Sequence, residues 1–357
     1  MKLQNKAQNL LAPLGWLFAS IVKTRQKLYQ KGFFQTRELG VPVISVGNLT
    51  FGGTGKTPLV AVTARLLAAR GHRVCVLTRG YKRKNQNQRI LVSDATKIFA
   101  DADSAGDEAF ELAQKLLGTA AVIADRNRFE AGRWALANLN STVFVLDDGF
   151  QHRRLKRNLD LVVVDATNPF GNEKLMPAGI LREPLENLGR ADCIILTRSD
   201  LIQNALPLKS KIEELNQHCP ILFSKNEITQ VTEIKEFFSK KTSGESANDK
   251  FEIQDLKSKI ALAFCALGNP QNFLKSLRLQ KFQISAASFF PDHHRYSQKD
   301  VEKIERKARA QNAEILLTTA KDAVKLQNLK FALPCFVIEI EAVFEDDRPL
   351  RELLEQL

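Results

Sequence analysis

The sequence lacks the cysteine patterns that bind metals or build disulfide frameworks. Its five cysteines include no CxxC pair, and most of them lie in apolar strand-like runs such as RVCVLT around Cys75. We therefore expect buried free thiols in a reducing compartment rather than a disulfide-stabilised secreted scaffold. The chain also has no internal repeat and no low-complexity segment, so a repeat architecture is not expected.

Acidic residues are missing from the start of the chain. None occurs before Glu38, although the formal net charge of the whole chain is +12. Nucleic-acid binding would suit such an excess, but the sequence has no recognition-helix, zinc or aromatic-platform signature, and we expect no nucleic-acid partner. An anionic membrane surface and an anionic substrate explain the charge equally well. The basic residues before Glu38 are Lys2, Lys6, Lys23, Arg25, Lys27, Lys31 and Arg37.

No apolar run is long enough to cross a bilayer comfortably. The longest, Leu10–Val22, would span about 20 Å as a helix, against a hydrocarbon core of about 30 Å. A signal peptide is the rival interpretation, but no small-x-small cleavage site is present. A helix lying on a membrane surface and an amphipathic helix packed on the core both remain possible. We favour the first, because the run contains Trp16 and Phe18 and is followed directly by basic residues.

Residues Val41–Val60, VPVISVGNLTFGGTGKTPLV, predict a strand, a glycine-rich loop and a helix. In a phosphate-binding loop the backbone N–H groups face phosphate oxygens, the lysine reaches the outer phosphates and the next hydroxyl ligates Mg²⁺. The strict pattern GxxxxGK[ST] needs glycine where this chain has Thr50, so the loop is a variant. An ordinary glycine-rich turn is the alternative, but the flanking strand and helix favour a nucleotide site. The expected nucleotide-binding residues are Asn48, Thr50, Gly52, Gly53, Thr54, Gly55, Lys56 and Thr57.

Beyond the loop, apolar strand patterns alternate with helical ones. Such alternation predicts an α/β fold with a parallel sheet covered by helices on both faces, and the loop makes it a P-loop NTPase-type sheet. A polar stretch, Ser239–Lys250, is expected to be a linker or exposed loop. At 357 residues the chain is long enough for two domains. We predict an N-terminal membrane-surface helix over residues 1–36, a core domain over 37–238 and a smaller α/β domain over 251–357.

Two carboxylates end one of the apolar strands, in VFVLDD up to Asp147 and Asp148. At the carboxyl end of a strand in an open α/β sheet, they would lie in the ligand crevice beside the phosphate loop. Holding Mg²⁺ opposite Thr57 is the expected task, and a simple Asp-Asp-Gly turn is the alternative.

Three other segments contain candidates for chemistry. Ser104 and Asp107 match a capping box, S-x-x-D, at the start of a helix, and the residues alone favour capping over a catalytic role for Asp107. In FPDHHRY, Asp292 and His293 would suit an orienting carboxylate–imidazole pair or a solvated loop equally well. Arg182 and Glu183 lie in a proline-bounded loop, PAGILREP, which is weak evidence by itself.

Six segments, taken together and in this order, resemble the tetraacyldisaccharide 4′-kinases of bacterial lipid A synthesis. They are VGNLTFGGTGKTP, GDE, LDDGFQHRRL, GILREP, FPDHHRY and TTAKDAVKL. The resemblance covers nearly the whole chain, LDDGFQHRRL and PDHHRY are its most specific parts, and Thr50 agrees with the family's own variant loop.

The resemblance implies transfer of the ATP γ-phosphate to the 4′-hydroxyl of a tetraacylated, 1-phosphorylated glucosamine disaccharide. It also implies a peripheral enzyme on the cytoplasmic face of the inner membrane, with ATP and Mg²⁺ as cofactors and a lipid as substrate. By match to the family's motifs, the catalytic residues would be Lys56, Asp107 as the base and His293 as its aid. Asp147 and Asp148 would lie near Mg²⁺, and Glu108, Arg182, Glu183 and Asp292 would line the site.

Two rival functions follow from the same fold. One is a nucleotide switch or ATPase at the membrane surface, for which Thr197-Arg198-Ser199-Asp200 resembles a degraded guanine-selecting [NT]KxD motif. The other is a scaffold with an inert nucleotide site, which the intact Lys56 and Thr57 disfavour. No feature of the sequence indicates an oligomeric state.

Overall fold

The computed structural model describes residues 12–81, 83–243 and 253–357, and this part of the chain divides into two compact units. One unit comprises the described residues up to Lys225 together with Ala342–Leu357, and the other comprises Asn226–Glu341. The chain passes between the units within β8 (Ile221–Glu233) and within β12 (Cys335–Phe344). The predicted domain limits, at 36, 238 and 251, stay a prediction.

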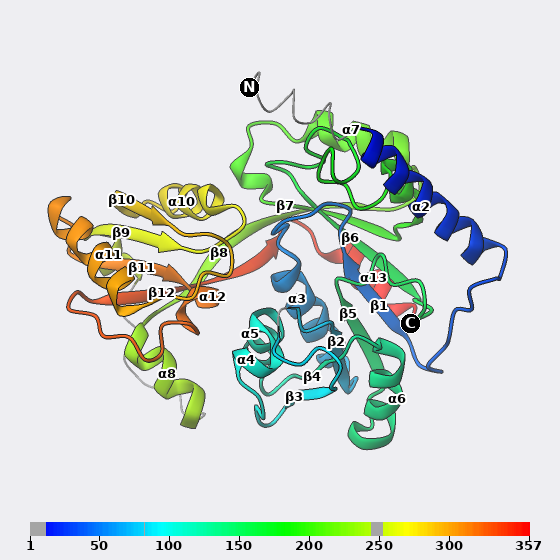
Figure 1. The fold of residues 1–357 in the computed structure, drawn as a ribbon, viewed down its shortest axis with the longest axis horizontal. Coiled ribbons are helices and arrows are strands. Elements are labelled where there is room, and N and C mark those ends of the chain that lie inside the picture. Colours follow the sequence, from blue (N-terminus) through cyan, green and yellow to red (C-terminus); the bar gives the residue numbers. More distant parts are fainter. Residues whose placement is uncertain (1–11, 82, 244–252) are drawn as a thin grey trace. The chain divides into compact units, whose positions relative to one another are not determined.

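The first unit is built on a mostly parallel sheet (Figure 1). Its strands run in the order β8-β7-β6-β1-β5-β2-β4-β3, with β1 between β5 and β6. Every residue of β1, β2, β4, β5, β6 and β7 is buried, as a parallel sheet covered on both faces requires. These strands are β1 (Val43–Gly47), β2 (Val74–Thr78), β4 (Ala120–Ala124), β5 (Val143–Asp147), β6 (Leu159–Asp165) and β7 (Cys193–Thr197).

One strand of this sheet departs from the parallel arrangement. β3 (Ile90–Asp94) pairs antiparallel with β4. A parallel strand needs a long crossover connection, usually a helix, and residues 83–89 between β2 and β3 form no helix. The chain therefore returns along the sheet in the opposite direction.

Helices cover both faces of the first sheet. Ile44, Val46 and Val145 pack in one apolar cluster with residues of α3, α5 and α13. The alternate residues Val43 and Phe144 pack on the other face with α6. The helices of this unit that follow β1 are α3 (Lys56–Ala68), α4 (Ala102–Ala105), α5 (Asp107–Lys115), α6 (Arg128–Leu139), η1 (Leu185–Arg190), η2 (Ser199–Leu201), α7 (Leu206–Leu215) and α13 (Arg348–Glu355).

In the second unit, the strands β10, β9, β11 and β12 pair in parallel in that order, as part of the same twelve-stranded sheet. Residues of α10 and α11 belong to two separate apolar clusters built on this sheet. Ser297 is the N-cap of α11, and its side chain accepts a hydrogen bond from the Asp300 N–H. The elements are α8 (Ile234–Ser243), α9 (Ile253–Lys257), β9 (Ile260–Cys265), α10 (Pro270–Leu279), β10 (Gln283–Phe289), α11 (Gln298–Ala310), β11 (Ile315–Thr319) and α12 (Ala320–Ala323).

The prediction of a linker over Ser239–Lys250 was wrong at its start. Helix α8 extends to Ser243, because its first turns are anchored by the buried side chains of Ile234 and Phe237 and a helix propagates cheaply once it is nucleated. Residues 244–250 lie outside the described part of the chain.

The N-terminal apolar segment forms α2 (Ala12–Gln30), and Leu10 and Leu11 lie outside the described residues. Its inner side packs closely on the first unit, where a Cβ added to Gly15 would lie 3.3 Å from the Ala178 Cβ. Leu14, Leu17 and Ile21 are exposed on the helix. Of the helices in the described ranges, none combines the length and the apolar character needed to cross a membrane.

Candidate active site

The glycine-rich loop connects β1 to α3. Gly52 and Gly55 have φ angles of 115° and 86°, a region that residues other than glycine rarely adopt. Gly55 is the N-cap of α3 and provides no side-chain hydrogen bond, so the first N–H groups of α3 remain available for an anion. Thr50 is not among the described residues with positive φ, which explains why the variant loop does not need glycine there.

Lys56 is the first residue of α3. Its Nζ donates to Asn48 Oδ1 at 3.1 Å and lies 3.5 Å from Asp148 Oδ1. The Asn48 amide in turn donates to the Thr50 carbonyl at 2.7 Å. The side chain of Asn48 in the loop and that of Asp148 at the end of β5 therefore jointly fix the position of the ammonium group.

The two carboxylates after VFVL have different partners. Asp147 is buried and accepts a hydrogen bond from the Thr78 hydroxyl at 2.8 Å. Asp148 has a positive φ of 52°, and Arg182 Nη1 donates to both of its carboxylate oxygens at 2.8 and 2.7 Å. Phe51 stacks under the Arg182 guanidinium at 4.5 Å.

These surroundings shift the pKa values of the two acids in opposite directions. Burial raises the pKa of Asp147 to about 6, and the charges of Glu108 and Asp148 add to this effect. Burial also opposes the ionisation of Asp148, but Lys56 and Arg182 outweigh it and lower the pKa of Asp148 to about 2. Asp148 is thus a firmly ionised carboxylate, whereas Asp147 carries its charge at an energetic cost.

Asp107 and Glu108 begin α5. The predicted capping box between Ser104 and Asp107 was wrong, because Ser104 ends the first turn of the short helix α4 and forms a capping box with Asp101. The N-cap of α5 is Gly106, with a φ of 90° and no side-chain cap. A Cβ at Gly106 would lie 2.7 Å from the Tyr81 carbonyl oxygen, so close backbone packing decides how α5 begins.

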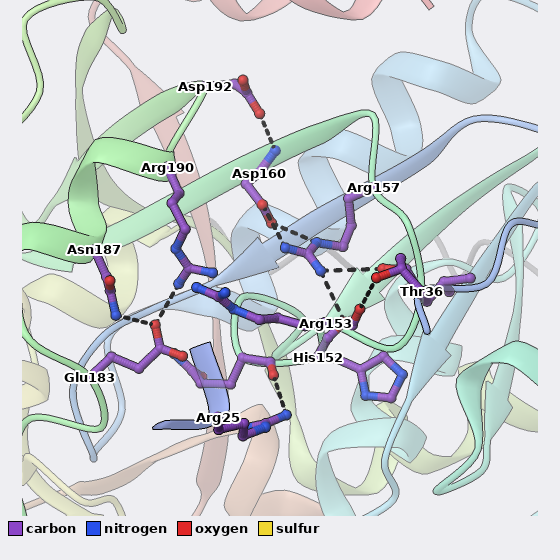
Figure 2. A network of polar contacts seen from close by, with 12 residues as sticks. Arg25, Thr36, His152, Arg153, Arg157, Asp160, Glu183, Asn187, Arg190 and Asp192 are labelled. Atoms are coloured by element: carbon purple, nitrogen blue, oxygen red, sulfur yellow. Dashed lines mark hydrogen bonds and ion pairs between the residues drawn. The ribbon is translucent and has the colours of Figure 1, made fainter. Parts of the chain in front are cut away.

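The structure brings Lys56, Asp147, Asp148, Glu108 and Arg182 together but places Glu183 differently. Although Glu183 follows Arg182 directly, its buried carboxylate accepts hydrogen bonds from Asn187 Nδ2 at 2.8 Å and from Arg190 Nη2 at 2.5 Å (Figure 2). It thus belongs to a neighbouring polar network.

Asp292 and His293 belong to the second unit. Asp292 Oδ1 accepts a hydrogen bond from Lys321 Nζ at 3.1 Å, and Asp292 Oδ2 lies 3.7 Å from His293 Nε2. The latter distance allows an ion pair but is too long for a hydrogen bond. The orienting pair predicted from the sequence is therefore a looser contact, and His293 is held with a positive φ of 65°.

Three further residues reach this site. Besides Thr78, they are Arg128, whose buried guanidinium donates to the Asp147 carbonyl at 3.3 Å, and Gln151, whose amide donates to the Asn48 carbonyl at 2.9 Å. Both Thr78 and Arg128 lie at or just after the carboxyl end of a parallel strand, and that position was the only signal available.

Comparisons with known proteins agree on one family. Residues 7–357 match the family model described as LpxK, Tetraacyldisaccharide-1-P 4′-kinase. A tetraacyldisaccharide 4′-kinase from Pelobacter propionicus is 37% identical over 98% of this chain and 92% of its own length. One from Aquifex aeolicus is 35% identical over 97% of this chain and 98% of its own length. The crystal structure of LpxK from Aquifex aeolicus in complex with ATP has a TM-score of 0.75 and 32% identity, covering 98% of this chain and 99% of that one.

The raised pKa of Asp147 predicts a pH-dependent gain in stability from Asp147→Asn. The carboxyl has a pKa of about 6 in the folded protein and an ordinary value of 3.8, so the folded state loses stability as pH rises from about 4 to about 6. The full cost, at most about 3 kcal/mol, applies above pH 6. Melting curves with EDTA and without nucleotide should show the variant more stable at pH 7.5, with the gain shrinking toward pH 4.5.

Asp148→Asn is the matched comparison, since the pKa of Asp148 is lowered to about 2. Its ionised carboxylate stabilises the folded state above pH 4, so this variant should lose stability at pH 7.5. A gain for Asp147→Asn that does not change with pH would contradict the assignment.

Proposed function

The chain belongs to the tetraacyldisaccharide-1-P 4′-kinase family, and from this premise we propose how its described residues carry out the reaction. The protein is a kinase that uses ATP to phosphorylate the 4′-hydroxyl of tetraacyldisaccharide 1-phosphate in lipid A biosynthesis. The observation that carries this conclusion is the family match over residues 7–357, which includes both the glycine-rich loop and the acidic end of β5. It supports the kinase over a nucleotide switch without a lipid acceptor.

The triphosphate of ATP binds at the loop before α3. The N–H groups at the start of α3 and the ammonium of Lys56 supply donors and positive charge for the outer phosphates. The rest of the expected nucleotide set, from Asn48 to Thr57, shapes this loop, as the Asn48–Thr50 hydrogen bond supports.

The residues at the end of β5 also suit a magnesium ion. Asp147, Asp148 and the Thr57 hydroxyl offer the hard oxygen ligands that Mg²⁺ prefers. Burial is the main cause of the raised pKa of Asp147, and repulsion by Glu108 and Asp148 adds to it; a cation would relieve this repulsion. A magnesium ion held there would neutralise charge on the transferring phosphate.

In the transfer step, the 4′-oxygen bonds to the γ-phosphorus while the bond to the β–γ bridging oxygen breaks and ADP leaves. By match to the family's motifs, Asp107 takes the hydroxyl proton, and His293 and Asp292 assist it. Lys56 and Arg182 stabilise the negative charge that spreads over the transferring group. Glu108 completes the polar lining, and Glu183 holds its neighbours Asn187 and Arg190 in position.

Asp107→Asn should remove most of the transfer activity without unfolding the protein. Because a positioned base contributes about 10²- to 10⁴-fold to rate, we expect a loss of that size in acceptor-dependent transfer. The assay incubates the protein with γ-labelled ATP, Mg²⁺ and the acceptor in detergent micelles, and then separates labelled lipid from water-soluble label.

Two controls make this result decisive. Wild-type label found only as inorganic phosphate, at a rate indifferent to the lipid, would contradict the kinase reaction itself. A drop of several degrees in the melting temperature of Asp107→Asn, large enough to explain the lost activity, would instead show that Asp107 supports the start of α5.

We also propose that α2 lies on the membrane surface that holds the acceptor, whose four acyl chains keep it in the bilayer. Trp16 and Leu17 are exposed by 78% and 60%, next to the exposed Leu14 and Ile21, and Lys23, Arg25, Lys27 and Lys31 follow on the same segment. Apolar side chains flanked by basic residues suit an anionic interface. The protein would thus be peripheral on the cytoplasmic face of the inner membrane.

Replacing Trp16 and Leu17 together by serine should reduce binding to anionic phospholipid vesicles about tenfold or more, because two apolar side chains no longer enter the interface. Co-sedimentation with vesicles measures the effect. Leu206→Ser is the matched control, since Leu206 on α7 is 65% exposed. Equal losses in both variants, or no loss in either, would argue against a membrane role for α2.

A further inference from the structure

A group of arginines lies on and around the segment that follows Asp148. We define the arginine group as Arg25, Arg153, Arg157 and Arg190 (Figure 2). Arg153 and Arg157 follow Asp148 in LDDGFQHRRLKR, Arg190 ends η1, and Arg25 comes from α2. Arg25 Nη2 reaches this segment by donating to the Gln151 carbonyl at 3.1 Å.

Two members of the arginine group are matched by carboxylates. Arg157 forms a fork with Asp160, with Nε to Oδ1 at 3.1 Å and Nη2 to Oδ2 at 2.9 Å. Arg190 donates to Glu183 and lies over the Phe150 ring at 4.2 Å. Both guanidinium groups are therefore fixed in place by partners that are themselves mostly buried.

The other two members have no carboxylate partner among the described residues. The bond from Arg25 goes to a neutral carbonyl. Arg153 is half-buried, its Nε is enclosed, and within the described ranges its side chain makes no hydrogen bond. Figure 2 shows its guanidinium pointing toward Arg190 and Glu183. Two guanidinium groups thus face one carboxylate.

The pKa values of two residues in this cluster indicate that positive charge is in excess there. Burial lowers the pKa of Arg190 to about 10, and Arg153 adds to this shift against the opposing effect of Glu183. Burial lowers the pKa of His152 to about 3, and the charges of Arg157 and Arg25 contribute. Keeping like charges together in a half-buried place is unfavourable, and a bound anion would relieve the repulsion.

The shape of the donors indicates which anion fits. A guanidinium presents parallel N–H groups that match the oxygens of a phosphate, and arginine stays charged when it is partly buried. Helix α2 reaches the cluster through Arg25, and it also carries the exposed apolar side chains proposed above to contact the membrane. A phosphate on a lipid would meet both features.

We propose that Arg153 and Arg190, with Arg25, form a subsite for a phosphate monoester, namely the 1-phosphate that the acceptor carries in addition to its reacting 4′-hydroxyl. This inference rests on the proposed function, since the family description names a 1-phosphorylated disaccharide. Glu183 acts here as a positioning residue, because it orients Arg190 without contacting the substrate.

The test compares two acceptors, the tetraacyldisaccharide with its 1-phosphate and the same lipid lacking it, in mixed micelles of neutral detergent. Arg153→Gln is the main variant, because removing Arg153 leaves no buried carboxylate unpaired. We expect a KM for the phosphorylated acceptor that is about 10- to 100-fold higher, the value of hydrogen bonds to a charged group. The kcat at saturating acceptor and the KM for ATP should stay unchanged.

The dephosphorylated acceptor distinguishes the substrate's phosphate from other anions. Wild-type KM for this lipid should already be raised, and Arg153→Gln should raise it no further. Arg153→Lys should restore only part of the affinity, since lysine keeps the positive charge but lacks the paired N–H donors of the guanidinium. Arg154→Gln, at the adjacent exposed arginine, is the charge-matched control and should behave as wild type.

Three outcomes would overturn the proposal. They are equal wild-type KM values for the two acceptors, an equal effect of Arg153→Gln on both acceptors, and an equal effect of Arg154→Gln. The second would mean that Arg153 acts without recognising the 1-phosphate, and the third that the loss of any nearby positive charge has the same effect. If wild-type protein labels neither lipid, the kinase function fails rather than the subsite.

Discussion

The ion pairs around Asp148 are the interaction on which the rest of the site depends. The Asp148 carboxylate lies between the Lys56 ammonium and the Arg182 guanidinium, and it thereby links the glycine-rich loop, the end of β5 and the proline-bounded loop that contains Arg182. The parallel pairing of β1 with β5, in which Val46 lies opposite Asp147, brings these segments to one edge of the sheet. Gly47 permits the close approach there, since a Cβ at this position would lie 2.6 Å from the Phe150 Cβ.

A local reversal of the backbone gives the two adjacent acids different environments. The positive φ of Asp148 turns its side chain toward Lys56 and Arg182, while Asp147 stays in the strand and faces Thr78. One carboxylate is consequently stabilised as an anion and the other is held at an energetic cost. The same segment continues through Gln151, whose amide donates to the Asn48 carbonyl, to Arg153, so one stretch of chain carries both acids and part of the arginine group.

Most of the fold could be predicted from the sequence because its signals are local. Continuous apolar runs such as VFVLD, and the glycines before Lys56, report burial and loop shape directly. The start of α5 could not be predicted, since the packing of Gly106 against Tyr81, rather than the Ser104–Asp107 spacing, decides it. The roles of Arg128 and Arg153 also depend on residues distant in sequence, and only the fold brings their partners to them.

The magnesium dependence of ATP binding tests the central role of Asp148 most directly. Titration calorimetry of wild type and Asp148→Asn, with and without Mg²⁺, gives four dissociation constants. We predict that Mg²⁺ tightens ATP binding by about tenfold or more in the wild type and hardly at all in the variant. Without Mg²⁺ the variant should bind ATP more tightly than the wild type, because Lys56 is released from its carboxylate partner. An equal magnesium effect in both proteins would contradict the account.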